Sequence, residues 1–302
     1  MSQETVYAIA SGKGGVGKTT TTVNLGTALA QAGKRVAIVD VDLGMANLAG
    51  FVSLNPDSTT LHDVLASDTA LEDATYRLAE NIVAVPSGTG LDDYAETSPE
   101  GLGAVVLSLR EEFDFVLLDV GAGVSHETVL PLGLADAVLL VSTPEPASVH
   151  DSKKTLELTD RAGGTVAGLI VTCTRPTGDV SYSEIADRLD LPLLGTIPED
   201  PSVRESVYAG TPLVVHEPDS PASVAYRKVA AELGDVQPPM QSPSADDPTD
   251  ADGDDGDDDS TDRQAHAGES TDADGRDTTD DSRAASHDDV SSAITEAESD
   301  SS

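Results

Sequence analysis

Eight residues near the start of the chain have the types and the spacing of a phosphate-binding loop. Residues 12–19 read Gly-Lys-Gly-Gly-Val-Gly-Lys-Thr, which fits the pattern GxxxxGK[ST]. Glycines let successive backbone N–H groups turn toward phosphate oxygens, and the dipole of a following helix favours the same anion. We expect Lys18 to reach the β- and γ-phosphates of a nucleotide and the Thr19 hydroxyl to bind Mg²⁺. The phosphate-binding residues that the pattern predicts are Gly12, Gly14, Gly15, Val16, Gly17, Lys18, Thr19 and Thr20.

Aspartates follow two further predicted strands. Asp40 and Asp42 come after the apolar run 36–39, and Asp119 follows the apolar run 115–118. We expect the side chains of Asp40 and Asp42 to point in different directions, so that one of them can face the phosphates. Asp119 leads into a glycine-containing loop in the manner of a Walker B aspartate, and we expect it to hold Mg²⁺ through water. The sequence thus supplies the carboxylates that a metal ion and a water molecule need.

Short apolar runs alternate with helical patterns along the body of the chain. The runs are four to six residues long and mostly apolar on both faces, which is typical of strands in a covered parallel sheet. Alternating strands and helices predict a doubly wound α/β fold with a mostly parallel sheet, whose ligands bind at the carboxyl ends of the strands. The predicted strands are 6–10, 36–39, 82–85, 115–118, 138–141, 166–171 and 193–197, and the predicted helices are 18–32, 99–111, 125–133, 146–162, 181–189 and 221–233.

Lys13 distinguishes this loop from an ordinary phosphate-binding loop. A second lysine would crowd the cation at Lys18 unless a phosphate lay nearby. Residues 11–20 resemble the deviant Walker A signature of the MinD/ParA family of P-loop ATPases, and the resemblance spans residues 5–235. It implies ATP and Mg²⁺ as cofactors and a homodimer that forms with ATP bound between two subunits. In such a dimer Lys13 would contact the phosphates of the partner subunit, much as an arginine finger does.

The same resemblance assigns roles to other residues. It implies that Asp42 positions the attacking water, while Asp40 supports the site. For the adenine base it points to two segments, one containing Arg175 between Thr174 and Pro176 and one containing Pro198 and Glu199. A guanidinium can stack on a purine, so Arg175 is a candidate lid, and a solvent-facing loop cation is the alternative. The predicted helix 146–162 aligns with a region that contacts the dimer mate and regulators, although an ordinary solvated face is the preferred explanation of its charges.

Taken together, the motifs predict a slow, partner-stimulated Mg²⁺-dependent ATP hydrolase. We expect a MinD-like switch that positions a cell-division, motility or chemosensory assembly through a protein regulator or cargo adaptor. The alternative is a ParA-type ATPase that partitions DNA, which the net charge of -38 disfavours. Relatives that carry an iron–sulfur cluster need paired cysteines, and this chain has one, Cys173. We expect Cys173 to be a small core side chain and the six scattered histidines to bind no metal.

Charge divides the chain into two parts. Residues 241–302 hold 21 acidic residues and three arginines, and their large apolar side chains are limited to Val290 and Ile294. Such a segment cannot bury enough surface to offset its ordering entropy, so we predict an ATPase domain at 1–237 and a disordered acidic tail at 238–302. The body is also acidic, which indicates adaptation to high salt, with a merely acidic protein as the alternative.

The sequence gives no sign of direct attachment to a membrane. It has no run of 18 apolar residues, and its first residues lack the basic start of a signal peptide. The basic amphipathic C-terminal helix that is typical of MinD proteins is also missing, because the acidic tail follows the last predicted helix. We therefore expect a cytoplasmic protein that reaches a cell pole or the membrane periphery through a partner.

Overall fold

The computed structural model describes residues 5–55, 58–67, 69–88, 101–123, 126–175 and 181–235. The chain divides into two units, Met1–Ala245 and Asp246–Ser302, and every described residue belongs to the first. The predicted acidic tail therefore lies outside the described residues, and so does Pro176 of the predicted base-binding segment.

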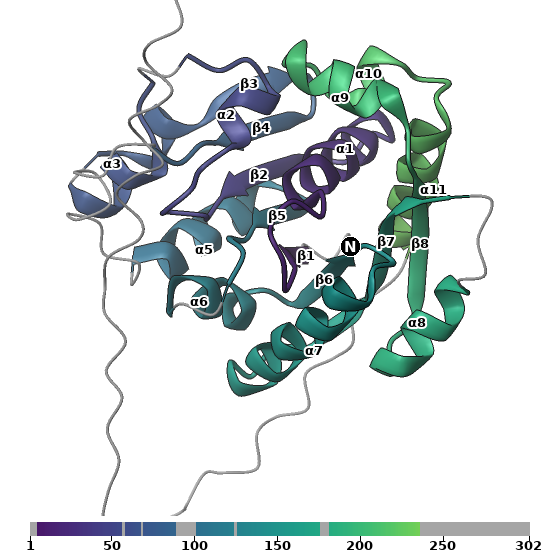
Figure 1. Ribbon diagram of the computed structural model, residues 1–302. Coiled ribbons are helices and arrows are strands. Elements are labelled where there is room, and N and C mark those ends of the chain that lie inside the picture. Colours follow the sequence, from purple (N-terminus) through teal and green to yellow (C-terminus); the bar gives the residue numbers. More distant parts are fainter. Residues whose placement is uncertain are drawn as a thin grey trace, which may run out of the picture. The chain divides into compact units, whose positions relative to one another are not determined.

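One eight-stranded sheet organises the described part of the chain, with the strand order β3-β4-β2-β5-β1-β6-β7-β8 (Figure 1). Neighbouring strands run parallel, except that β3 is antiparallel to β4. The strand order reverses direction at β1, and the carboxyl ends of strands beside such a switch point form the ligand crevice of doubly wound folds. The strands are β1 (Thr5–Ala10), β2 (Val36–Asp40), β3 (Tyr76–Ala79), β4 (Ile82–Val85), β5 (Phe115–Asp119), β6 (Ala137–Ser142), β7 (Val166–Thr174) and β8 (Leu193–Pro198).

Helices cover both faces of this sheet. One face carries α1, α10 and α11, and the other carries α5, α6 and α8. No helix in the described ranges is both long and apolar enough to cross a membrane. The helices are α1 (Lys18–Gln31), α2 (Leu48–Phe51), α3 (Leu61–Ala66), the 3₁₀ helix η1 (Leu71–Ala74), α5 (Leu102–Glu112), α6 (His126–Leu134), α7 (Pro146–Arg161), α8 (Tyr182–Leu189), α9 (Pro201–Tyr208), α10 (Leu213–His216) and α11 (Pro221–Asp235).

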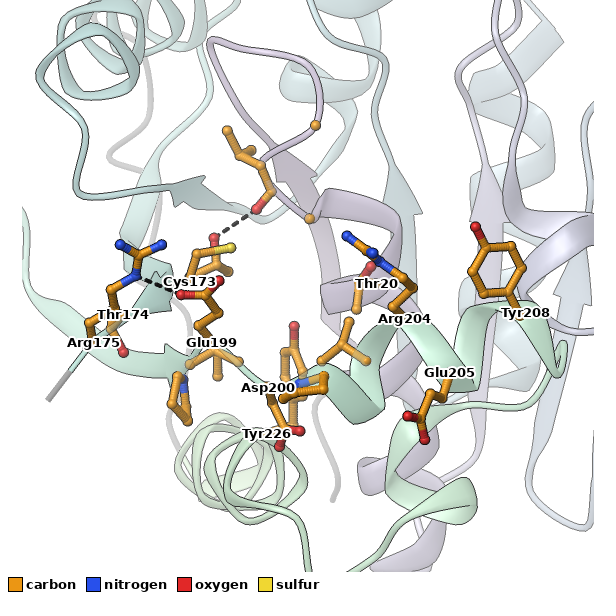
Figure 2. A pocket seen from close by; sticks show the side chains of 18 residues that line it. Thr20, Cys173, Thr174, Arg175, Glu199, Asp200, Arg204, Glu205, Tyr208 and Tyr226 are labelled. Carbon is orange, nitrogen blue, oxygen red and sulfur yellow. Dashed lines mark hydrogen bonds and ion pairs between the residues drawn. The ribbon is translucent and has the colours of Figure 1, made fainter.

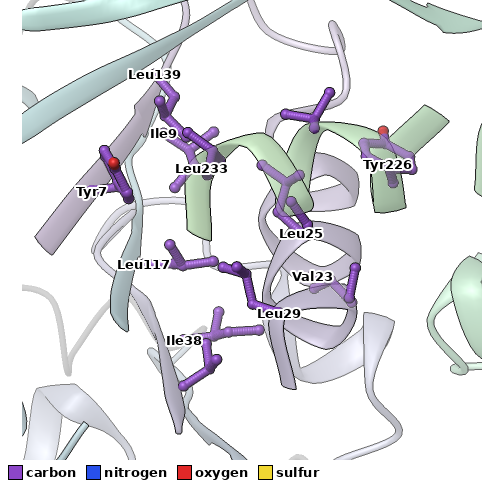
Figure 3. Close-up of a cluster of buried hydrophobic side chains, with 14 of the residues drawn as sticks. Tyr7, Ile9, Val23, Leu25, Leu29, Ile38, Leu117, Leu139, Tyr226 and Leu233 are labelled. Carbon is purple, nitrogen blue, oxygen red and sulfur yellow. The ribbon is translucent and has the colours of Figure 1, made fainter. Parts of the chain in front are cut away.

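The apolar runs of the sequence form the centre of this sandwich. In β1, Tyr7 and Ile9 belong to the cluster under α1 and α11, which Figure 3 shows, while Val6, Ala8 and Ala10 belong to the cluster on the opposite face. All five side chains are essentially inaccessible to solvent. Because both faces are covered, apolar residues stand at consecutive positions and not at alternate ones.

The predicted α/β fold and its seven strands are confirmed, with β7 three residues longer than predicted. The sequence analysis missed β3, an edge strand whose residues alternate between half-buried and exposed positions and therefore lack a continuous apolar run. It also missed the short helices α2, α3, η1, α9 and α10. Helices of one or two turns are too short to show a clear helical periodicity.

Candidate functional site

The phosphate-binding loop joins β1 to α1 at the switch point of the sheet. Gly17 caps α1 with a φ of 91°, in the left-handed region that glycine enters without steric cost. The loop is also held from β7, because the Thr172 hydroxyl donates a 2.7 Å hydrogen bond to the carbonyl of Val16. On its other side Gly12 lies directly against the backbone of α7 at Asp151, where a Cβ atom would have no room.

The two predicted metal ligands meet at the carboxyl end of β5. The Thr19 hydroxyl donates a 2.6 Å hydrogen bond to Asp119 Oδ2, and the Thr22 hydroxyl donates a 3.0 Å hydrogen bond to Asp119 Oδ1. The sequence analysis missed Thr22, although its spacing of three residues from Thr19 on one helix predicts that both face the same side. Hydroxyl and carboxylate oxygens are hard ligands of the kind that Mg²⁺ prefers.

Burial dominates the electrostatics around this pair. The pKa of Asp119 is raised to about 6, chiefly because the carboxyl is buried, although hydrogen bonds from Thr19 and Thr22 and the charge of Lys18 oppose the shift. Burial likewise lowers the pKa of Lys18, against the attraction of Asp119 and Asp42. Within the described ranges, Lys18 Nζ has neither a hydrogen-bond nor an ion-pair partner. The ammonium group is therefore partly desolvated and directed at a site where an anion would stabilise it.

Asp40 and Asp42 occupy different environments at the end of β2. Alternation along a strand would place residues two positions apart on the same face, and the two side chains differ because Asp42 lies beyond β2, in the loop that follows it. Asp40 is buried, and burial followed by the charge of Asp119 raises its pKa to about 7, against hydrogen bonds from Leu48, Asn47 and Asp42. Asp42 is only partly buried and accepts a 3.0 Å hydrogen bond from Met45 N. Its carboxylate lies against Gly121 in the loop after β5, where a Cβ atom would be 2.9 Å from Asp42 Cγ. Asp42 thus stands where the loops after β2 and β5 meet.

Lys13 lies on the exposed side of the phosphate-binding loop, beside α7. The Ser11 hydroxyl holds its backbone through a 2.8 Å hydrogen bond to the Lys13 carbonyl. The nearby Asp151 carboxyl has a lowered pKa, mainly because Lys154 donates a 2.9 Å hydrogen bond to it and to a smaller extent because of the charge of Lys13. The Lys13 side chain is therefore exposed and close enough to α7 for its charge to act on Asp151.

A cavity of about 990 Å³ extends from the phosphate-binding loop to α9. Figure 2 shows Arg175 and Glu199 meeting on one side of it, while Arg204 and Tyr208 extend from α9 on the other. Arg175 Nε donates a 2.6 Å hydrogen bond to Glu199, so the ends of β7 and β8 are joined by an ion pair. The cavity is lined by Gly15, Val16, Gly17, Thr20, Thr172, Cys173, Thr174, Arg175, Ile197, Pro198, Glu199, Asp200, Pro201, Val203, Arg204, Glu205, Tyr208 and Tyr226.

The expectation that Cys173 is a core side chain is wrong. Its thiol is exposed and lines the cavity. The residue adopts a φ of 53° where the pairing of β7 with β8 becomes irregular between Val171 and Thr174, which turns its side chain out of the sheet. Burial by the cavity walls nevertheless raises the pKa of the thiol.

Across the described ranges, no three His, Cys, Asp or Glu side chains come together as metal ligands. A Mg²⁺ site of the predicted kind does not need such a cluster, because Mg²⁺ keeps several waters and takes one or two protein ligands together with substrate phosphates. Among the described histidines, His62 has a structural role, since both of its ring nitrogens lie within hydrogen-bond distance of backbone atoms.

Comparison with known proteins agrees with this geometry. The chain is 39% identical over 227 residues to an uncharacterized ATP-binding protein of Methanocaldococcus jannaschii, covering 75% of this chain and 86% of that protein. The septum site-determining protein MinD of Pyrococcus horikoshii, solved with Mg-ADP, superposes with a TM-score of 0.72 at 36% identity, over 76% of this chain and 95% of that one. A MinC:MinD cell division complex of Aquifex aeolicus gives a TM-score of 0.69 at 29% identity, over 79% of this chain and 98% of that one. Residues 7–213 match the CobQ/CobB/MinD/ParA nucleotide binding domain, and the chain belongs to that family.

Proposed function

We propose that this chain is a Mg²⁺-dependent ATPase of the MinD type, which dimerises when ATP is bound and so positions a cell-division, motility or chemosensory assembly. The observation that carries the proposal is the 2.6 Å contact between Thr19 and Asp119 beside Lys18, at the head of a glycine-capped helix. Thr19 and Asp119 would hold Mg²⁺, and the backbone N–H groups of residues 12–20 with Lys18 would hold the phosphates.

Hydrolysis is assigned to Asp42. Its carboxylate lies against Gly121 and is only partly buried, so a water molecule can reach it from the phosphate side. An aspartate at this position orients an attacking water without holding the phosphates themselves. Asp42→Ala should therefore keep ATP binding while losing turnover, which would leave the dimer trapped in its ATP-bound form.

The cavity that leads away from the loop is assigned to the nucleoside. It has the size and the mixed apolar and polar lining of a small-molecule site. Arg175, Glu199 and Pro198 line it, and Pro198 is the last residue of β8. The ion pair fixes the guanidinium plane of Arg175 at the mouth of the cavity, where a purine can stack on it.

Lys13 is assigned to the dimer. It is exposed, and it lies beside α7, a charged surface on which a second subunit can dock. A cation supplied in this way to the phosphates of the partner would stabilise the charge of the transition state. The MinD proteins that this chain resembles are septum site-determining and cell division proteins, and one is solved with MinC, which supports a switch that recruits a protein partner.

Two lysine variants test this proposal. Lys18→Ala removes a cation aimed at the site within the same subunit and should lose ATP affinity. Lys13→Ala should keep much of that affinity but lose both dimerisation, measured by light scattering with ATP and Mg²⁺, and turnover. By analogy with fingers supplied in trans, the loss of rate is at most roughly 10³- to 10⁵-fold. Equal losses of ATP affinity in both variants would show that Lys13 acts within its own subunit, and the dimer switch would have to be abandoned.

A further inference from the structure

The loop that carries Asp42 is closed by a buried carboxylate. This loop, residues 41–47 between β2 and α2, is called the Asp42 loop below. The Asp40 carboxylate is 1% exposed and accepts three backbone hydrogen bonds, from Asp42 N at 3.1 Å and from Asn47 N and Leu48 N at 2.9 and 3.0 Å. Asp42 lies near one end of the loop, and Asn47 and Leu48 lie where its other end meets α2. A single side chain therefore ties the two ends of the loop together.

His62 holds the middle of the same loop from outside. It lies on α3 with 1% of its surface exposed, and its Nε2 is 3.0 Å from the carbonyl oxygen of Leu43. Its Nδ1 accepts a 2.9 Å hydrogen bond from Gly88 N, in the segment that follows β4. Because a backbone N–H can only donate, Nδ1 carries no proton, and the proton on Nε2 is donated to Leu43. The ring therefore links Leu43 to Gly88 through hydrogen bonds at both of its nitrogens.

The segment after β4 contacts both Asp40 and His62. The Ser87 hydroxyl donates a 2.7 Å hydrogen bond to the backbone carbonyl of Asp40, and its neighbour Gly88 donates to His62. Asp40 and His62 are therefore both held by Ser87 and Gly88, which follow β4, the neighbour of the edge strand β3. The Asp42 loop itself has no helix or strand, and its Met45 side chain is 76% exposed, so its shape depends on these contacts.

We propose that Asp40 and His62 are positioning residues, which hold the Asp42 loop in the form that aims the Asp42 carboxylate at the attacking water. This inference rests on the proposed ATPase function. A loop that is already fixed does not have to be ordered during the reaction, and a carboxylate displaced by about 1 Å loses much of its effect on the rate. In the described ranges, the hydrogen bonds of His62 go to Leu43 and Gly88 and not to the phosphate-binding loop or to Asp119. Its loss should therefore slow turnover without weakening the binding of ATP.

His62→Phe in the full-length chain is the test, because phenylalanine keeps the shape of the ring and removes both hydrogen bonds. We expect kcat for ATP hydrolysis with Mg²⁺ to fall about tenfold while the Kd for ATP stays within about twofold. Hydrogen exchange should become faster at the amides of Asp42, Asn47, Leu48 and Gly88 but not within the strands. His216→Phe is the matched control, since His216 is exposed on α10 and should change neither value.

His62→Gln separates positioning from a general role in folding. The glutamine amide nitrogen can reproduce the Nε2 bond to Leu43, whereas His62→Asn can reproduce the bond at Nδ1 to Gly88. Glutamine should therefore restore more of kcat than asparagine, and it serves as the test variant if the phenylalanine variant does not fold. A kcat equal to that of the unmodified chain in His62→Phe would overturn the inference, and so would a matching loss of ATP affinity and of strand protection.

The same experiment keeps this inference apart from the proposed function. If the unmodified chain binds ATP and Mg²⁺ but never hydrolyses ATP, the proposed function fails. In that case hydrogen exchange still tests the inference, because unchanged amide exchange in His62→Phe would show that His62 does not hold the Asp42 loop. If the unmodified chain hydrolyses ATP and His62→Phe does so at the same rate, the inference fails alone.

Discussion

Gly12 is the position at which a single methyl group should disturb the site most. A Cβ atom there would lie 2.2 Å from both the carbonyl carbon and the carbonyl oxygen of Asp151 and 2.7 Å from Ser152 N. These are backbone atoms of α7 and cannot rotate away. Ordinary contacts begin near 3.4 Å, so Gly12→Ala must move the phosphate-binding loop or α7 by about 1 Å.

Two magnitudes follow from this displacement for Gly12→Ala. Overpacking of this kind costs about 1 to 3 kcal/mol, and for a domain of this size each kcal/mol lowers Tm by about 2 to 4 °C, so we expect a drop of roughly 2 to 12 °C. A loop displaced by about 1 Å should also lower kcat/KM for ATP on the order of 10²-fold. Differential scanning calorimetry of the nucleotide-free protein and steady-state ATP hydrolysis measure the two effects.

Gly14→Ala is the matched control for stability. Nothing lies within 4 Å of its Cβ position, and its φ is outside the left-handed region, so its free energy of unfolding should change by no more than about 0.5 kcal/mol. If Gly12→Ala is as stable as Gly14→Ala and binds ATP as the unmodified chain does, the close packing of the loop on α7 is not what shapes the site.

Two further predictions concern the pH dependence of stability and the cavity thiol. The pKa values of Asp40 and Asp119 are raised to about 7 and about 6, above the unfolded value near 3.9, so between pH 4 and 7 the folded state binds more protons than the unfolded state. The free energy of unfolding measured with urea should therefore rise as the pH falls from 7 to about 5 at fixed salt, and it should rise less in Asp40→Asn. The same dependence of this free energy on pH in both proteins would contradict the raised pKa of Asp40. Cys173, the single cysteine of the chain, should be alkylated by iodoacetamide more slowly than a free thiol because its pKa is raised, and saturating ATP should protect it. If ATP does not change the rate of alkylation, the nucleoside does not bind in the cavity that Cys173 lines.

The parts of this molecule that depend on local pattern could be predicted from the sequence. The strands are apolar at consecutive positions because both faces of the sheet are covered, and the phosphate-binding loop has a fixed spacing of glycine, lysine and threonine. Since the carboxyl ends of parallel strands meet at one edge, the proximity of Asp119 to Thr19 also followed from the fold class.

The features that the sequence did not reveal depend on tertiary contacts or on local irregularity. Cys173 belongs to an apolar run, and only the irregular end of β7 turns its thiol outward. His62 reads as one of several scattered histidines, because its partners Leu43 and Gly88 lie 19 and 26 residues away and act through their backbone. Arg204 and Tyr208 reach the cavity from α9, a helix too short to be recognised by periodicity.

The binding of ATP with and without Mg²⁺ tests the central claim most directly. Isothermal titration of the full-length chain at multimolar KCl, with Mg²⁺ or with EDTA, should be run in parallel on Thr19→Val, which keeps the shape of the side chain and removes the hydroxyl that meets Asp119 at 2.6 Å. We predict that the unmodified chain binds ATP more tightly with Mg²⁺ than with EDTA, and that Thr19→Val loses most of this difference while keeping the affinity seen with EDTA. No binding of ATP by the unmodified chain, or an equal effect of Mg²⁺ on both proteins, would contradict the assignment of this site.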